Sequence, residues 1–568
     1  MNRNANTLTT AATLALAAGS LFAETGGYPA CIASSHEREL HTIAELMFNQ
    51  IPAEHQAQIA LKGGIGSAGF DLQAFDSRAD AELPEGIEPD LTAHEYLDLI
   101  VSDELSARLS QNQWNILNSI ADTLDSGKQV PHLCFAPGTD PEYAYAINQL
   151  IEYPLQFRFQ QTNRWTRTAV DGSGLSQGDP TTITYSFVPD GTFVPNLGLG
   201  LGSGNSVLFQ WLDSRYNGDT QFWQGLFHQV FDRWAELTGL DYIFEPNDDG
   251  ATTNSAVGFV GVRGDVRIAA YNFANDGNGG VLAYNNFPND GDMVFDAFDS
   301  FFNSTGGNSL RLRNVAAHEH GHGLGMLHVC PANGTKLMEP FIDLGFDGPQ
   351  LDDILNGHRH YGDPTEPNEN LNTAIDLGDV DAPAFISRDN LSIDDNSDID
   401  IMRLNITERS ALTIAIGPQA GTIRTGPQTQ FCNSGTLVDY NAIQDLEIEL
   451  FSATDLLTPV ATENTQGAGG IDTLVYDVEE PGVFYAIISA ASNVNNVQRY
   501  QATVFTAELP PLACPADLNG DETLDFFDIS IFIAAFNNNE PDGDFDNNGE
   551  WNFFDVSGFI SAFNAGCP

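Results

Sequence analysis

The sequence predicts a multidomain protein: a helical N-terminal region and an α+β domain, followed by an all-β sandwich and a small α-helical module. Three observations favour this division. The chain has 568 residues, more than one hydrophobic core usually supports. Helical, mixed and strand-only patterns follow one another along it. Its C-terminal end contains an internal repeat.

The composition is strongly acidic. The chain has 22 basic and 78 acidic residues, which gives a net charge of -56. Its lysines are Lys62, Lys128 and Lys336. Such a chain would repel nucleic acid and anionic membranes, so we expect neither as a partner.

Residues 1–23 have the pattern of a secretory signal peptide: an arginine, a short apolar run of Ala and Leu, then small residues. No later run approaches the roughly 20 apolar residues of a membrane span. We therefore expect a secreted protein without a membrane span, in which disulfides can persist. Of the six cysteines, Cys514 and Cys567 bracket one compact segment and are the best candidate pair, whereas the pairing of Cys31, Cys134, Cys330 and Cys432 stays open.

Residues 24–160 show a helical period, as in "SARLSQNQWNILNSIADTL". Residues 161–363 combine short strands ("TTITYSF", "DVRIAAY") with an amphipathic stretch that predicts a helix ended by Gly239. Residues 364–511 read as strands separated by turn residues, which indicates a β-sandwich. Residues 512–568 hold two segments that align without gaps at a period of 27.

The stretch "AAHEHGHGLGMLHVC" contains four of the chain's twelve histidines. His318 and His322 are four apart and share one helix face, so they can bind one metal ion together. Gly323 and Gly325 would weaken the helix and let the chain turn back, bringing His328 round as a third ligand.

Three neutral imidazoles leave a tetrahedral zinc ion one open position for water, whose pKa falls towards about 7. A nearby carboxylate can take its proton, which assigns Glu319 as general base and the ion as Lewis acid for a peptide carbonyl. The alternatives are a polar surface helix with coincidental histidines and a purely structural metal site. The full H-E-x-x-H-x-x-G-x-x-H spacing favours catalysis.

On these residues the chain resembles the metzincin metallopeptidases and, within them, the matrixins. Met338 in "KLMEP" matches the family's methionine turn, and the Pro two residues later, Pro340, matches the matrixin branch. "LDDILNGHRHYG", with its paired acids, resembles the closing helix of the matrixin domain. The resemblance covers residues 165–362 and implies an α+β metzincin domain with a twisted mixed sheet and long helices.

Matrixins carry a second, structural zinc, and two of its histidines should fall where this chain has Tyr284 and Val294. The resemblance therefore implies one zinc, not two. A calcium site next to it is implied by Asp276, Asp296 and Asp299, which could instead be ordinary acidic turn residues.

The segment after Met338 should form the wall of the substrate pocket, with Pro340, Phe341 and Ile342 favouring an apolar side chain. Matrixins are also kept silent by a propeptide cysteine, and Cys134 in "PHLCFAPGTD" is a candidate for that switch. The Arg before it and the Gly after it are both missing, so a structural disulfide is the alternative.

The stretch "EPNENLNTAIDLG" with "DNSDIDIMRLNI" resembles the small β-sandwich appended to secreted bacterial peptidases; binding and spacing are both open roles. In the two repeats, oxygen donors recur with the rhythm of an EF-hand calcium loop, each followed by an apolar helix. These donors are Asp517, Asn519, Asp521 and Asp528 in the first loop and Asp544, Asp546, Asn548 and Asp555 in the second. The pair resembles dockerins, which implies Ca²⁺ and a cohesin-like partner.

These observations predict a secreted zinc endopeptidase that acts on protein or peptide substrates and carries accessory modules. The alternative is a calcium-dependent adhesion or scaffold protein whose peptidase domain is inactive. Intact Glu319 and three intact ligands favour the enzyme.

Overall fold

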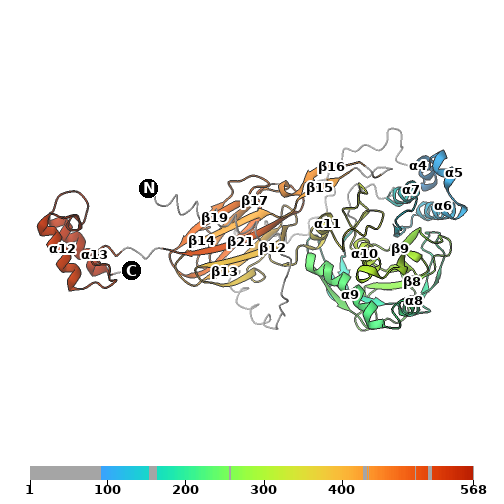
Figure 1. Cartoon of the computed structure of the whole chain (residues 1–568), viewed down its shortest axis with the longest axis horizontal. Helices are drawn as coiled ribbons and strands as arrows, with labels where there is room; N and C mark the ends of the chain where they lie inside the picture. Colours follow the sequence, from blue (N-terminus) through green and yellow to red (C-terminus); the bar gives the residue numbers. More distant parts are fainter. Residues whose placement is uncertain are drawn as a thin grey trace.

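The computed structural model describes residues 91–152, 163–254, 257–426, 432, 434–492, 494–509 and 514–566 (Figure 1). The signal peptide predicted at 1–23, the N-terminal region up to residue 90, Cys31 and Cys567 lie outside them. Within the described ranges, no helix is both long and apolar enough to cross a bilayer.

Four helices form the described part of the N-terminal region: α4 (Ala93–Ile100), α5 (Asp103–Arg108), α6 (Gln111–Asp125) and α7 (Pro141–Glu152). The first three start where a Thr or Ser side chain accepts a hydrogen bond from the first helical turn, as helix N-caps commonly do. Between α6 and α7 lies β1 (His132–Phe135), a strand that the helical pattern did not predict.

A six-stranded sheet forms the centre of the next region, in the order β1-β9-β10-β8-β4-β7. Strands β7, β4, β8 and β10 are parallel, β9 runs antiparallel to β10, and β1 runs antiparallel to β9 at the edge. The sheet of the expected 161–363 domain therefore includes a strand from the preceding region. The bounds are β4 Thr181–Phe187, β7 Leu240–Phe244, β8 Val266–Tyr271, β9 Val281–Asn285 and β10 Met293–Asp296, with short pairs β2 (Arg167–Thr168), β3 (Gly172–Ser173), β5 (Phe193–Val194) and β6 (Gly204–Asn205).

Both faces of this sheet are covered by helices. On one face, alternate side chains of β4, β8 and β10 pack against α8 (Leu208–Arg215), α9 (Thr220–Leu237) and α10 (Gly306–Gly323). On the other face, Tyr271, Val281 and Val294 pack against α4, α6 and α7 (Figure 1). The N-terminal region thus covers part of one face of the sheet.

One buried ion pair ties the sheet to a neighbouring loop. Arg267 on β8 donates to both carboxylate oxygens of Asp248, at 2.8 and 2.7 Å, and neither side chain is exposed above 1%. Removing one partner of such a pair leaves an uncompensated buried charge.

We therefore expect Asp248→Asn to lower the free energy of unfolding by about 3–5 kcal/mol, measured by chemical denaturation. Arg233→Ala removes the exposed Arg233–Glu236 pair and is the control, with an expected cost of about 1 kcal/mol or less. Equal effects of the two variants would contradict the account.

After α11 (Leu351–Tyr361) the chain forms two sheets that share one hydrophobic core, of orders β11-β13-β20-β17-β18 and β12-β21-β14-β19. The strand-only pattern of residues 364–511 is thus a two-sheet β-rich region. Its elements are β11 Ile375–Val380, β12 Ala384–Ile393, β13 Ile399–Ile406, β14 Ser410–Pro418, β15 Thr422–Thr425, β16 Thr436–Asp439, β17 Leu446–Ser452, β18 Ala461–Glu463, β19 Asp472–Val478, β20 Gly482–Ala490 and β21 Gln498–Glu508.

A disulfide joins the two regions. Cys330, two residues after His328, is bonded to Cys432, 102 residues further along. Arg359 on α11 also donates to the Asp394 carbonyl at 2.9 Å. Cys134, by contrast, is a buried free thiol, so the alternative of a structural disulfide at this cysteine is wrong.

The C-terminal module contains α12 (Phe526–Asn538) and α13 (Phe553–Ala565). Phe532 and Phe559, at equivalent places in the two repeats, stack with ring centroids 4.1 Å apart. The core around them consists of residues from this module. Cys514 is disulfide-bonded, and its predicted partner Cys567 lies outside the described residues.

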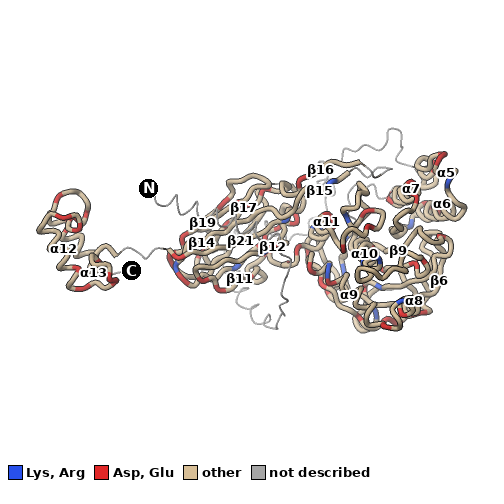
Figure 2. Tube along the Cα trace, viewed as in Figure 1, with Lys and Arg blue, Asp and Glu red and all other residues tan. Residues whose placement is uncertain are grey.

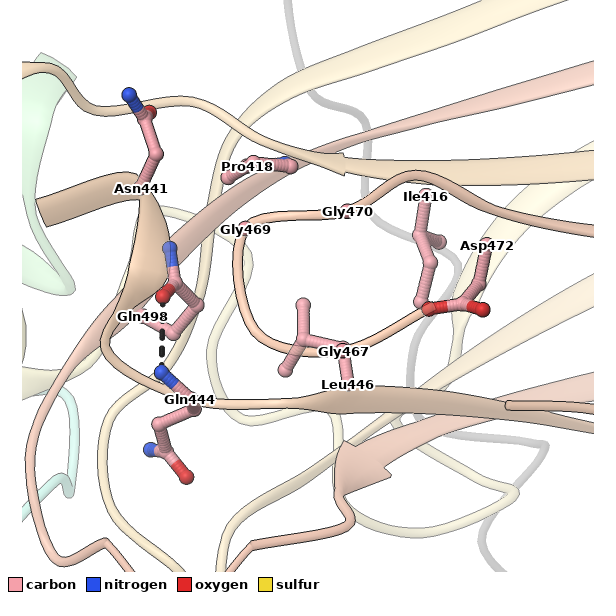
Figure 3. A pocket seen from close by; sticks show the side chains of 10 residues that line it. All are labelled: Ile416, Pro418, Asn441, Gln444, Leu446, Gly467, Gly469, Gly470, Asp472 and Gln498. Carbon is pink, nitrogen blue, oxygen red and sulfur yellow. Dashed lines mark hydrogen bonds between the residues drawn. The ribbon is translucent and has the colours of Figure 1, made fainter. Parts of the chain in front are cut away.

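Acidic side chains are spread over every part of the fold, with few basic ones between them (Figure 2). A small pocket at one end of the two-sheet region is lined by residues that include Ile416, Gln444 and Gln498 (Figure 3). Its volume of about 10 Å³ holds roughly one water molecule, so it is no ligand pocket.

Candidate metal centre and neighbouring sites

Three histidine rings converge at the end of α10. The Nε2 atom of His328 lies 3.1 Å from Nε2 of His318 and 3.2 Å from Nε2 of His322. Four nitrogen ligands at the usual Zn–N length in a tetrahedron are roughly 3.3 Å apart. The two distances from His328 therefore fit ligands that share one zinc ion.

Local backbone geometry explains how His328 reaches the other two. Helix α10 ends at Gly323, and Gly325 has φ +96°, a left-handed conformation that favours glycine. A Cβ atom at Gly325 would collide with the carbonyl oxygen of Asn163. The turn at Gly325 thus returns the chain towards the helix.

The other nitrogen of each ring is also engaged. Nδ1 of His318 lies 2.7 Å from the Leu337 carbonyl oxygen, and Nδ1 of His322 lies 2.7 Å from that of Met326. Nδ1 of His328 lies 3.0 Å from Oδ1 of Asn148, on α7 of the N-terminal region. Since a carbonyl can only accept, Nδ1 of His318 and of His322 carries the proton and leaves Nε2 free for a metal.

Burial keeps these rings neutral. It lowers the pKa of His318 to about 4 and those of His322 and His328 well below their usual range, with the neighbouring histidines adding to the shift for the latter two. Neutral imidazole is the form that binds a metal, so the electrostatics and the geometry agree. His320, on the opposite side, is instead held by the Tyr242 hydroxyl at 2.7 Å.

Glu319 is fully buried beside His318. Neither of its carboxylate oxygens has a nitrogen or oxygen partner among the described residues. Burial raises the pKa of Glu319 well above its usual range, and the contact with Cys134 opposes this. A carboxyl group in this setting holds a proton more readily than one in water, as a general base must during turnover.

Met338 packs against α10, with its sulfur against Gly321, where a Cβ would overlap it. The buried carboxylate of Asp353 on α11 accepts from the Met338 amide at 3.1 Å and from the Leu337 amide at 2.9 Å. Residue 353 therefore fixes the loop whose carbonyl orients His318.

Strand β1 lies in the groove beside these residues. It pairs with β9 on one side, with Cys134 opposite Ala283. On the other side the Phe135 amide donates to the Pro340 carbonyl at 3.3 Å, and the Ile342 amide donates to the Phe135 carbonyl at 3.4 Å. The predicted pocket segment thus runs along β1, and the Phe341 ring lies 6.3 Å from that of Phe135.

Two side chains of β1 face the metal centre. Cys134, the predicted switch, is fully buried. Its sulfur, a ring nitrogen of His318 and a carboxylate oxygen of Glu319 lie within 4.8 Å of one another. Burial, reinforced by Glu319, raises the pKa of this thiol well above its usual range. His132 forms a second such group with His322 and His328.

Sequence reasoning missed His132. The available signal was its place two residues before Cys134, which puts both on one face of a strand. A cleft of about 680 Å³ continues the groove beyond the start of β1 and is lined in part by Lys128 and Phe287.

The predicted calcium ligands of this domain also lie together. Burial raises the pKa of Asp276 to about 7 and that of Asp296 to about 6, and repulsion from Asp299 adds to both shifts. Within the described part of the chain, Oδ2 of Asp296 is buried without a hydrogen-bond partner. The carboxylate oxygens of Asp276 and Asp296 are hard donors of the kind that a calcium ion binds.

Tyr284 and Val294, which stand where the structural zinc ligands of matrixins were expected, are both buried in the core beneath α4, α6 and α7. The side chains at these two positions are part of the hydrophobic core.

In the terminal repeats, the carboxylates of Asp544, Asp546 and Asp555 lie within 4.8 Å of one another. In the first loop, Asp528 accepts from the Leu518 and Asp525 amides at 2.9 Å each, while Asn519 donates to Asp521 at 2.8 Å. The remaining predicted donors, Asp517 and Asn548, accept backbone or side-chain hydrogen bonds within their own loops.

Sequence reasoning also missed a carboxylate cluster at the junction of the two regions. Carboxylate oxygens of Asp363, Glu366 and Asp400 lie within 4.8 Å of one another, as do those of Glu366, Glu369 and Asp398. Burial, reinforced by neighbouring carboxylates, raises the pKa of Glu366 and Asp398 well above their usual range. The dense acids of "DPTEPNE" and "DDNSDID" were the available signal. The cluster, here called the junction carboxylates, can hold a divalent cation.

Removal of calcium should therefore destabilise the protein. Calcium at 100 times its Kd contributes about 2.7 kcal/mol, or roughly 5–10 °C in Tm for regions of this size. We expect a calcium-selective chelator to lower Tm by this amount at pH 8. Asp398→Asn should reduce the shift, whereas Asp376→Asn, which removes an exposed carboxylate, should not.

The chelator effect should be small at pH 5. The folded-state pKa values of these carboxyls are raised, that of Asp363 to about 6, so the metal-free protein loses stability as pH rises through them. A chelator effect equal at both pH values would contradict this assignment.

Two histidines and a glutamate thus lie on one helix, and a third histidine follows the turn after it, beside a mixed sheet. Residues 207–355 match the family model of the matrixins, peptidase family M10. The match supports a metalloendopeptidase of the matrixin type, with protein or peptide as substrate. It includes Glu319 and all three ligand histidines.

Among solved structures, the chain is similar to the pre-peptidase C-terminal domain of a collagenase from Bacillus anthracis, with 12% identity over 23% of this chain and 95% of that one, and a TM-score of 0.16. It is also similar to PliG, a periplasmic inhibitor of g-type lysozyme from Aeromonas hydrophila, with 6% identity over 23% of this chain and 98% of that one, and a TM-score of 0.15. Scores this low carry no argument. No curated protein matches the sequence.

Proposed function

We propose that the chain is a secreted, zinc-dependent endopeptidase in which Glu319 is the general base. The observation that carries this proposal is the convergence of three neutral imidazoles, 3.1 and 3.2 Å apart at Nε2, next to a buried glutamate. A purely structural zinc site would need no buried carboxylate beside it.

When bound by His318, His322 and His328, zinc supplies Lewis-acid chemistry. The protein's own residues orient the ligands and transfer the proton. The Leu337 and Met326 carbonyls hold the rings in one tautomer, and Glu319 accepts a proton at its carboxylate from the attacking water and returns it to the leaving amine. Met338 packs against α10, which carries two of the ligands.

The groove between β9 and Pro340–Ile342 is the proposed substrate site. Strand β1 occupies this groove and forms backbone hydrogen bonds on both sides, as an extended peptide substrate would. Phe341 and Ile342 favour an apolar substrate side chain. A peptide library cleaved with charged residues preferred next to the scissile bond would contradict that preference.

The accessory modules are proposed to bind calcium and a protein partner. The carboxylates of Asp544, Asp546 and Asp555 support a calcium site in the dockerin-like repeats. Phe526, Phe527, Phe553 and Phe554 are each at least 63% exposed, which supports an apolar docking face for a cohesin-like partner.

The decisive assay is casein hydrolysis with and without a zinc chelator, before and after the chain is cut next to β1, which frees the N-terminal end of that strand. A lysine-specific protease should cut after exposed Lys128, just before β1, since Lys336 is buried and Lys62 lies outside the described residues. The added protease is then inactivated with a serine-protease inhibitor. Equal hydrolysis by the cut wild type, its chelated form and cut Glu319→Ala would refute the peptidase.

A further inference from the structure

We propose that His132 is a fourth protein ligand of the active-site metal in the described state, and that Cys134 blocks the general base instead of the metal. This inference rests on the proposed function. It concerns how the same site is silenced.

The backbone of β1 sets the direction of both side chains. Leu133 and Phe135 belong to the core beneath α4, α6 and α7, whereas Cys134 belongs to the core on the α10 face. Since strand side chains alternate, His132 and Cys134 project together towards α10. The β9 register, with His132 opposite Asn285, places them at the histidine triad.

The His132 side chain lies beside the metal centre and makes no hydrogen bond among the described residues. Its ring is fully buried, and neither Nδ1 nor Nε2 has a hydrogen-bond partner among the described residues. Its neighbours are the rings of His322 and His328, with centroids 4.8 and 5.3 Å away, and of Phe287 at 4.9 Å. A buried imidazole with two unsatisfied nitrogens is costly, and a ligand bond to the ion would remove the cost.

Cys134 has a different neighbour. Its sulfur lies within 4.8 Å of a ring nitrogen of His318 and of a carboxylate oxygen of Glu319. A hydrogen on sulfur directed at Glu319 would occupy the group that must accept a proton from water. His132 would therefore block the metal, and Cys134 would block the general base. Both contacts break when β1 leaves the groove.

Cobalt(II) in place of zinc tests this assignment, because its visible spectrum reports coordination and a bound thiolate adds a charge-transfer band in the near ultraviolet. The full chain should bind one cobalt(II) at the triad without that band. Azide should leave the spectrum unchanged. In His132→Ala, azide should perturb the spectrum, and the Kd for zinc should rise by about tenfold or more, as it does even when outer partners are lost.

Cys134→Ala is the matched control, since it truncates a buried side chain on the same strand and face. It should keep the wild-type spectrum, the insensitivity to azide and the zinc affinity. His320→Ala controls for loss of a buried histidine on α10 and should also leave the cobalt spectrum unchanged.

A charge-transfer band that is present in wild type and absent in Cys134→Ala would overturn the assignment in favour of a cysteine ligand. A wild-type spectrum that already responds to azide would show an open metal and would overturn it too, while the proposed peptidase would stand. Failure of the wild-type chain to bind metal at the triad would contradict both the His132 assignment and the proposed peptidase.

Discussion

Glu319→Gln should lower kcat/KM for a peptide substrate by about 10²–10⁴-fold, the usual contribution of a general base. The amide has the shape of the carboxylate but accepts no proton. Because Glu319 is not a ligand, zinc content should stay at one equivalent at the triad. The measurement is peptide hydrolysis by chains cut after Lys128, with zinc determined on the same samples.

Glu236→Gln on α9 is the matched control, since this exposed glutamate pairs with Arg233 on its own helix. It should keep wild-type activity. Undiminished hydrolysis by Glu319→Gln would contradict the assignment of the base. Loss of zinc together with activity would indicate a structural role for residue 319.

Cleaving the chain between Glu152 and Asn163, at an inserted site for a sequence-specific protease, should leave the N-terminal fragment bound. Tyr271, Tyr284 and Val294 are buried against α4, α6 and α7, and each such side chain contributes about 1.5–3 kcal/mol. The two fragments should co-elute in gel filtration. The chain from Asn163 onwards, made alone, should aggregate.

The same site inserted between Glu508 and Cys514 is the control. The core of the C-terminal module contains residues of that module, so this cut should release it as a separate species. A stable, monomeric protein beginning at Asn163 would contradict the structural role and would favour an ordinary detachable propeptide.

The prediction from sequence was best for features that lie within one segment. The helix that carries His318 and His322 ends at Gly323, where the glycines predicted a turn. The predicted helix before Gly239 is α9, and "TTITYSF" and "DVRIAAY" become β4 and β8. Strand β1 was not predicted, because four residues between two helical stretches carry no period of their own.

The prediction was poorest for groups assembled from distant segments. Asn148 and His328, partners at 3.0 Å, are separated by 180 residues, and nothing in either local sequence marks the pairing. The junction carboxylates likewise combine acids of residues 363–369 with Asp398 and Asp400. The pairing of Cys330 with Cys432 stayed open for the same reason.

By itself, the sequence indicated the candidate metal ligands, the candidate base and the succession of mixed, strand-only and repeated regions. These depend on spacing along one helix or strand, which the backbone period sets. Only the tertiary structure decided that a strand from the N-terminal region completes the sheet, fills the groove and brings His132 to the triad. Such contacts depend on strand register and on which apolar faces cover one another, and these are settled when the whole core packs.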